Sequence, residues 1–262
     1  MAATIRIFSF FVLTIALLPG TVSAQADDVA DVPSRDLRAG KDEQKRFFLI
    51  GPRKEARVPK QGYGLVVILP GGSGSADFHP FVKRIFKYAV PDGYLMAQPV
   101  AVKWTEEQEI VWPTEKNTVE KMKFSTEKFV ADVIKEVAAR EKVNPKKVFT
   151  FSWSSSGPAA YAISLAGKTV AGSFIAMSVF KPEQLPSLEK AKDHAYYLYH
   201  SPADRVCPYR MAQQAARDLK KNGATVKLQT YEGGHGWKGG LYDHIREGIV
   251  WLEKNSMAAA GK

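Results

Sequence analysis

One short segment of the chain has residues suited to nucleophilic chemistry. Residues 149–151 end an apolar, strand-like run, and the small residues of 152–157 follow it directly, where a helical pattern begins. A serine hydroxyl is a poor nucleophile unless the backbone exposes it beside a base and amide donors. Small residues on both sides of a serine permit the tight turn that does this. The segment therefore predicts a nucleophilic serine on a strand-to-helix turn.

The spacing of small residues selects Ser154 as that nucleophile. In the pattern G-x-S-x-G, called a nucleophile elbow, the positions two before and two after the serine must be small. With Ser154 at the centre, Ser152 and Ser156 occupy those positions. The alternative register, with Ser155 at the centre, puts Trp153 two residues before it, where the indole would collide with the turn.

A histidine between glycines is the candidate base. His235 follows the last strand-like run, and the flanking Gly233, Gly234 and Gly236 let the backbone present the imidazole to a site. The other histidines are more simply explained as surface or packing residues: His79, His194, His200 and His244. His79 is also kept as a candidate for the substrate site, because its loop must lie over the nucleophile.

The order strand, serine turn, acid and histidine resembles that of the α/β-hydrolase superfamily, particularly its exported carboxylesterase and feruloyl or polyester esterase branches. The resemblance covers roughly residues 46–254. It implies the α/β-hydrolase fold, in which a mostly parallel twisted sheet carries helices on both faces. It also implies cleavage of carboxylic esters through an acyl-enzyme intermediate. Both glycines of the usual elbow are serines in this chain.

Asp204 is the acid that this resemblance implies. It follows a strand-like run and precedes a helical pattern, and the family's acid loop often has Val and then Pro after the acid, as Val206 and Pro208 stand here. A carboxylate there would hold the histidine in the required tautomer and stabilise the imidazolium. The alternative is an aspartate that caps a helix or a turn.

A glycine-rich loop is the candidate oxyanion hole. Residues 69–74 close an apolar strand-like run, and their glycines allow backbone N–H groups to turn toward one point. Gly72 or Ser73 would supply one donor and the Ser155 amide the other. The family often has His before these glycines, whereas Pro70 stands here.

Aromatic residues are predicted at the substrate site. The candidates are Trp104, Trp112, Trp153 and His79. The tryptophans are expected on loops or turns at the C-terminal edge of the sheet, where open α/β sheets bind ligands. Packing on the core is the alternative for Trp104 and Trp112. Trp237 is expected to support His235, and residues 101–122 are expected to set substrate specificity.

Apolar β-branched or aromatic runs alternate with helical patterns, which is typical of a parallel sheet covered by helices. The predicted strands are residues 46–50, 65–69, 94–100, 147–151, 172–179, 195–199 and 226–231. The predicted helices are residues 80–89, 125–142, 157–166, 209–221 and 242–254. No Gly/Ser-rich linker interrupts this pattern, so residues 46–262 are predicted to form a single domain.

The N-terminal residues have the pattern of an exported protein. Residues 1–24 combine Arg6, an apolar run and small residues before Ala24, which predicts a cleaved signal peptide and a secreted or periplasmic protein. The apolar run is shorter than the roughly 20 residues that a membrane-spanning helix needs, so no stable membrane anchor is predicted. Residues 25–45 are polar with little periodicity and are predicted to form a flexible arm.

Composition and missing motifs exclude several other functions. The formal net charge is +10, but the positive charges are spread among acids and form no aromatic-interleaved stripe, so no nucleic acid partner is predicted. Phosphate-binding glycine motifs and clustered metal-ligand spacings are missing, so no cofactor and no metal is predicted. Cys207 is the single cysteine, which rules out an internal disulfide.

The sequence therefore predicts an exported serine esterase with the triad Ser154, Asp204 and His235, acting on a small-molecule or polymer ester. A serine peptidase or an acyltransferase with the same triad is one alternative, because the sequence does not define the leaving group. A non-catalytic binding protein on this fold is the other, since serines replace both elbow glycines. The sequence leaves the oligomeric state open.

Overall fold

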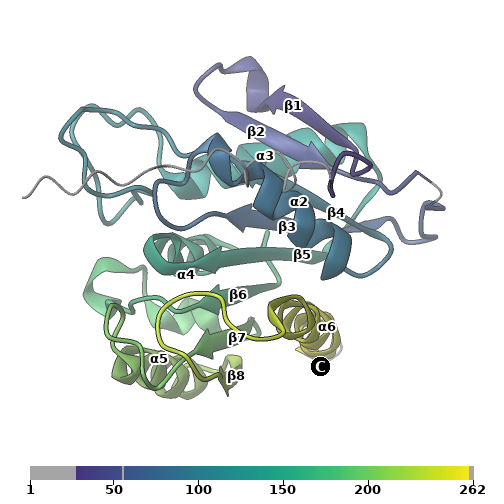
Figure 1. Ribbon diagram of the computed structural model, residues 1–262. Helices are drawn as coiled ribbons and strands as arrows, with labels where there is room; N and C mark the ends of the chain where they lie inside the picture. Colours follow the sequence, from purple (N-terminus) through teal and green to yellow (C-terminus); the bar gives the residue numbers. More distant parts are fainter. Residues whose placement is uncertain (1–27, 55, 260–262) are drawn as a thin grey trace, which may run out of the picture.

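The computed structural model describes residues 28–54 and 56–259, which form one sheet with helices on both faces (Figure 1). The strands are β1 (Ser34–Arg38), β2 (Arg46–Ile50), β3 (Tyr63–Leu69), β4 (Tyr94–Pro99), β5 (Val143–Trp153), β6 (Gly172–Ala176), β7 (Ala195–His200) and β8 (Thr225–Thr230). The α-helices are α2 (His79–Tyr88), α3 (Thr126–Arg140), α4 (Gly157–Ala166), α5 (Tyr209–Lys221) and α6 (Leu241–Ala259). Short 3₁₀ helices are η1 (Ala39–Lys41), η2 (Ala76–Phe78), η3 (Ser154–Ser156), η4 (Pro182–Gln184) and η5 (Leu188–Ala191). The predicted signal peptide lies outside the described residues.

The sheet is mostly parallel, as predicted. Its strand order is β1-β2-β4-β3-β5-β6-β7-β8. The strands from β3 to β8 all run in one direction, whereas β2 runs antiparallel to both of its neighbours, β1 and β4. The central strands β3, β4, β6 and β7 are buried along their whole length. Strands covered on both faces read as continuous apolar runs, which is why the sequence predicted them correctly.

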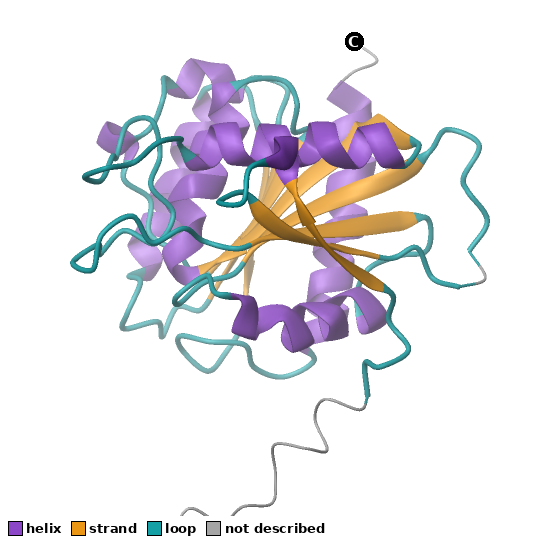
Figure 2. Cartoon of the chain, turned by 90° about the horizontal axis from the view of Figure 1, so that it is seen from above, coloured by secondary structure: helices purple, strands orange, loops and turns teal. Residues whose placement is uncertain are grey.

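Helices cover the two faces of the sheet in two groups (Figure 2). Val66 and Ile68 of β3 belong to the apolar cluster that includes the buried residues of α2 and α6. Leu65 and Val67, which alternate with them along the strand, belong to the cluster that includes α3. The helices α4 and α5 share a third cluster with β6 and β7. The described part of the chain contains no helix both long and apolar enough to cross a membrane.

The edge strand β1 corrects the prediction of a flexible arm over residues 25–45. Residues 34–38 pair antiparallel with β2, and Val29 and Val32 are buried in the core. Asp36 in β1 forms an ion pair with Arg46 of β2 at 2.8 Å. A short, charged edge strand pairs on one side only and has no apolar alternation, so its sequence resembles that of an irregular segment.

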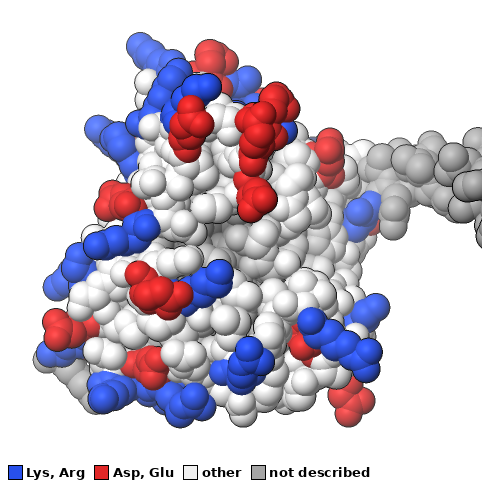
Figure 3. All heavy atoms as spheres, turned by 90° about the vertical axis from the view of Figure 1, so that its left-hand side faces the viewer, with Lys and Arg blue, Asp and Glu red and all other residues white. Residues whose placement is uncertain are grey.

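Because the strands from β3 to β8 are parallel, the loops that follow them gather at one edge of the sheet. These loops lie on the left of Figure 1, and they carry residues 154–156, 201–208 and 231–240. Figure 3 looks onto this edge and shows a hollow whose middle has few charged side chains. Ligands of open α/β sheets bind at this edge.

Candidate active site

Ser154 stands between β5 and α4 in a backbone conformation that residues other than glycine rarely adopt. Its φ is +55°, a left-handed value that costs conformational energy in an L-residue. Two groups hold the Ser154 carbonyl: the Ser178 hydroxyl donates to it at 2.6 Å, and the Gly157 N–H donates as well. The predicted strand-to-helix turn is present, and Ser154 occupies its strained position.

The two serines that replace the elbow glycines are buried and have hydrogen-bond partners. Ser156 Oγ donates to Leu69 O at 2.6 Å and accepts from the Trp153 N–H at 3.1 Å, so it ties the turn to the end of β3. Ser152 Oγ donates to Phe174 O in the neighbouring β6 at 3.4 Å. Serine therefore fits both positions.

Gly157 is the position at which the turn does require glycine. A Cβ atom there would overlap the Ser178 side chain and would lie 3.1 Å from Ile175 Cγ2. Since Ser178 also holds the Ser154 carbonyl, the missing side chain lets α4 start close to the loop after β6. The turn therefore requires glycine three residues after Ser154, whereas the usual pattern has glycine two residues after the serine.

His235 lies against both Ser154 and Asp204. Its Nε2 is 3.0 Å from Ser154 Oγ, and its Nδ1 is 2.9 Å from Asp204 Oδ2. An ionised carboxylate only accepts hydrogen bonds, so the proton is on Nδ1 and Nε2 is free to accept from the serine hydroxyl. The structure thus brings the three residues predicted as a triad into one hydrogen-bonded chain.

Asp204 remains ionised although its side chain is buried. Burial raises the pKa of this carboxyl, but the N–H groups of Val206 and Cys207 both donate to Oδ1 at 2.8 Å, and His235 donates to Oδ2. These donors outweigh burial and lower the pKa below its usual value. A carboxylate therefore faces His235 at neutral pH.

The loop that carries His235 depends on its glycines. Gly233, Gly234 and Gly236 have φ values of +114°, +78° and +116°. Side chains are rarely tolerated at such angles, so the predicted use of these glycines is confirmed. The Gly234 N–H donates to Ser201 Oγ at 3.1 Å, which links this loop to the acid loop.

A second histidine contacts the same carboxylate, although the sequence predicted only a surface or packing residue at its position. His200, at the end of β7, is 2% exposed, and its Nε2 lies 2.7 Å from Cys207 O and 3.3 Å from Asp204 Oδ2. The carbonyl only accepts, so Nε2 carries a proton. Burial lowers the pKa of His200, which keeps the ring neutral at neutral pH. The sequence signal for this contact was that His200 lies four residues before Asp204 in the same segment.

The predicted oxyanion loop lies beside the nucleophile turn. Leu69 pairs with Ser152 in the sheet, and Ser155 Oγ donates to Gly72 O at 3.0 Å. Gly72 has a left-handed φ of +59°. Within the described residues, the N–H groups of Gly72 and Ser73 donate to no protein acceptor. These amides are therefore available to a ligand next to Ser155.

Trp112 anchors this loop from the side. It is buried, and its indole N–H donates to Pro70 O at 2.9 Å. A Cβ atom at Gly74 would lie 2.9 Å from the Trp112 ring, so that glycine makes room for the indole. The Pro70 carbonyl thus serves as the point of attachment.

The packing of two other tryptophans bears on their assignment to the substrate site. Trp153 is 6% exposed and packs edge-on against Phe78, Phe81 and Trp237, with ring centroids 5.8 to 5.9 Å apart. Trp104 packs edge-on against Phe124 at 4.9 Å. Trp153 therefore belongs to the core, which corrects its assignment. Trp104 is half-buried, and its assignment to the substrate site stays a prediction.

His79 is turned toward β1, β2 and β4. Its Nδ1 lies 2.8 Å from Gln98 Oε1, its Nε2 lies 2.9 Å from Ser34 Oγ, and its ring stacks on Phe48 at 3.9 Å. The loop before α2 does lie near the nucleophile turn, but the His79 side chain belongs to the packing of the edge strands. The prediction for His79 is therefore corrected as well.

Comparisons with known proteins bear on the fold. No protein-family model and no curated protein sequence matches the chain. Among solved structures, Thermogutta terrifontis esterase 2 is 14% identical, with a TM-score of 0.61, 85% of this chain and 92% of that chain being covered. A fungal esterase from Rhizomucor miehei is 12% identical, with a TM-score of 0.63 and coverages of 91% and 90%. MGS-M1, an α/β-hydrolase enzyme from a deep-sea metagenome library of the Medee basin, is 14% identical, with a TM-score of 0.60 and coverages of 87% and 99%.

The chain has the α/β-hydrolase fold. In this α/β-hydrolase fold, the strained serine, the histidine and the aspartate stand on the loops after β5, β8 and β7. The fold was predicted from the sequence because the serine turn, the acid segment and the histidine segment follow strand-like runs in the order typical of this fold.

A cavity of about 170 Å³ opens beside the turn that carries Ser154. Ser155 and Trp112 line it together with polar residues from the loops after β4 and β6, among them Asn117, whose amide donates to Gln184 Oε1 at 3.3 Å. Its charged lining residues are Glu109 and Lys181. The cavity therefore offers polar partners to a small group held next to Ser154.

One group of described residues has donors close enough for a metal ion, namely Asp204, Cys207 and His235. Asp204 and His235 already use their donors within the hydrogen-bonded chain. Burial raises the pKa of the Cys207 thiol to about 11, so no thiolate is available at neutral pH. The hydrogen-bonded chain explains this cluster better than a metal site does.

Proposed function

We propose that the protein is a serine hydrolase that cleaves carboxylic esters through an acyl-enzyme intermediate. One observation carries this proposal: Ser154 Oγ, His235 and Asp204 form a continuous hydrogen-bonded chain that begins on a strained turn. A packing role would not require a serine at a left-handed φ beside an imidazole nitrogen with a free lone pair.

In the first half of the reaction, Ser154 Oγ attacks the ester carbonyl and His235 Nε2 takes the hydroxyl proton. The imidazolium that forms is stabilised by the Asp204 carboxylate at 2.9 Å from Nδ1. The tetrahedral oxyanion would accept hydrogen bonds from the amides of Gly72 or Ser73 and Ser155. Collapse of the intermediate breaks the ester C–O bond, and His235 returns its proton to the leaving alcohol.

In the second half, water replaces the alcohol. His235 takes a proton from water as the hydroxide attacks the acyl carbonyl, and the same amides stabilise the second oxyanion. The acyl–Oγ bond then breaks, the proton passes from His235 to Ser154, and a carboxylic acid is released. After one cycle, Ser154 and His235 have returned to their starting protonation states.

The substrate proposal rests on the neighbours and on the cavity beside Ser155. The similar structures named above include two esterases, which favours an ester over an amide as the substrate class. The 170 Å³ cavity lined by Trp112, Asn117 and Gln184 would receive a small polar part of that ester. We also propose that the protein acts outside the cytoplasm, which rests on the signal-like pattern of residues 1–24.

Steady-state hydrolysis of p-nitrophenyl acetate and of p-nitroacetanilide tests this function. We expect turnover of the ester, little turnover of the anilide, and a loss of at least about a thousandfold in kcat for Ser154→Ala. Ser155→Ala is the matched variant for the other register, and it should lose at most about tenfold because its backbone N–H remains. Ester turnover that survives Ser154→Ala would contradict the assignment.

A further inference from the structure

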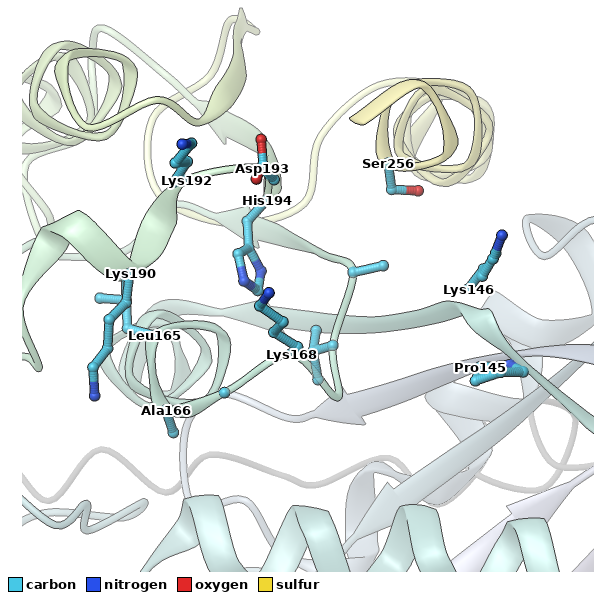
Figure 4. Close-up of a pocket in the computed structure, with 13 residues that line it drawn as sticks. Pro145, Lys146, Leu165, Ala166, Lys168, Lys190, Lys192, Asp193, His194 and Ser256 are labelled. Carbon is cyan, nitrogen blue, oxygen red and sulfur yellow. The ribbon is translucent and has the colours of Figure 1, made fainter. Parts of the chain in front are cut away.

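A separate cavity of about 540 Å³ lies at the opposite edge of the sheet from Ser154 (Figure 4). It is formed where β5, β6 and β7 begin and where α4 and α6 end, with Lys146, Ala171, His194, Ala166 and Ser256 in its lining. Ser154 follows the other end of β5. At about 3.3 Å per strand residue, the two places are roughly 25 Å apart.

The size and the lining of this cavity suit a small organic molecule. Its volume lies within the range of about 300 to 1,000 Å³ that is usual for small-molecule sites. Pro145, Ala166 and Ala171 provide an accessible apolar surface. A ligand that uses this surface must carry a hydrocarbon part.

The charged residues around the cavity are mostly positive. Lys146, Lys168, Lys190 and Lys192 line it, against a single acid, Asp193. None of these four lysines forms an ion pair within the described part of the chain. Several unpaired ammonium groups at one cavity create a positive potential that favours an anion.

His194 adds a buried polar group to the same lining. The residue is 7% exposed, and its Nδ1 has no hydrogen-bond partner among the described residues. Figure 4 shows its ring reaching in among the lining residues beside Lys168. That nitrogen has almost no accessible surface, so the part of the ring that lines the cavity is not this atom.

We propose that this cavity binds an organic carboxylate. The hydrocarbon part would lie against Ala166 and Ala171, and the carboxylate would lie among the ammonium groups of Lys168 and Lys190. An inorganic anion would use the charges but not the apolar surface, and a neutral hydrocarbon would use only the surface. The proposal does not depend on the activity at Ser154.

Calorimetric titration of the full chain with octanoate tests this site. We expect saturable one-to-one binding, and we expect the double variant Lys168→Glu/Lys190→Glu to weaken it at least tenfold. The matched control is Lys135→Glu/Lys220→Glu, which makes the same charge change at exposed positions of α3 and α5 and should bind octanoate like the wild type. All these lysines are exposed, so the variants are expected to fold.

Two further titrations define the ligand class. Octanamide has the same chain without the charge, and inorganic phosphate has charge without the chain; both should bind at least tenfold more weakly than octanoate. Absence of octanoate binding, equal binding of either comparison compound, or equal weakening in the control variant would overturn the proposal. If octanoate bound at the triad instead, the Lys168→Glu/Lys190→Glu variant would bind it as tightly as the wild type does. That result would also overturn the proposal. Ester hydrolysis by each variant, measured in parallel, reports on the proposed function separately.

Discussion

His200 Nε2 lies 3.3 Å from Asp204 Oδ2, the same oxygen that His235 Nδ1 contacts at 2.9 Å. His200 is held there by its bond to Cys207 O, while the Cys207 N–H donates to the other carboxylate oxygen. The acid is thus enclosed by donors on both sides. His200 touches no reacting atom, so its role is to position Asp204.

Removal of this positioning contact should reduce turnover without changing substrate binding. We expect His200→Phe to lower kcat for p-nitrophenyl acetate by about tenfold, with KM nearly unchanged, because a small displacement of a catalytic group is costly. His200→Gln keeps an N–H near the Nε2 position and should recover most of the loss. The pH profile of kcat should shift in the Phe variant and not in the Gln variant. A Phe variant with wild-type kcat and profile would contradict this role.

The hydroxyl of Ser156 should stabilise the turn. Ser156→Ala removes the donor to Leu69 O, and a buried carbonyl left without its partner costs about 1 to 3 kcal/mol. We expect that decrease in the free energy of unfolding by urea denaturation, together with a smaller kcat. Ser164→Ala is a comparison at a buried serine of α4, remote from the turn, and should leave kcat intact. Unchanged stability and kcat in Ser156→Ala would show that the hydroxyl is dispensable.

Gly157 should tolerate no side chain. A Cβ atom there overlaps Ser178, so Gly157→Ala is expected to lower the free energy of unfolding by about 1 to 3 kcal/mol and to displace the group that holds the Ser154 carbonyl. Gly167→Ala is the matched control, since a Cβ atom at Gly167 meets nothing within 4 Å. Thermal unfolding and ester turnover measure both effects. Equal behaviour of the two alanine variants would contradict the packing argument.

Stability should fall as the pH drops below about 6.5. Burial lowers the pKa of His194 and of His200, so the unfolded chain, whose histidines titrate near 6.5, binds protons that the folded chain does not. Each histidine contributes a slope of up to about 1.4 kcal/mol per pH unit in that window, with the folded state favoured at higher pH. Urea unfolding at pH 7.5, 6.5 and 5.5 measures it. His200→Gln should lessen the slope, and a flat profile in the wild type would be inconsistent with neutral buried histidines.

The sequence predicted the sheet well because its parallel strands are buried on both faces. Runs such as residues 65–69 are apolar throughout, without alternation of apolar and polar residues, and glycine or proline stands at their ends. The strand β1 was missed because its stability comes from pairing with β2 and from contacts such as the Asp36–Arg46 ion pair. Nothing in the spacing of those residues identifies their partners.

The candidate site was predictable as far as loop positions determine it. Ser154, Asp204 and His235 each follow a strand of the parallel sheet, so their meeting at one edge follows from topology. The direction of a side chain does not follow in that way. His79 and Trp153 stand near the expected loops, but the His79 ring packs against the edge strands and the Trp153 ring belongs to the core. His200 stood within the acid segment all along, and its burial gave it a role that its type alone did not indicate.

The most direct test of the account is covalent labelling of Ser154. The purified protein would be treated with a fluorophosphonate, digested, and mapped by mass spectrometry, alongside His235→Ala. We predict one modified site, Ser154 Oγ, with labelling at least about a hundredfold slower in His235→Ala because the base that accepts the hydroxyl proton is gone. Label on another residue, or no label on a folded protein that also fails to hydrolyse esters, would contradict the assignment of Ser154 as the nucleophile.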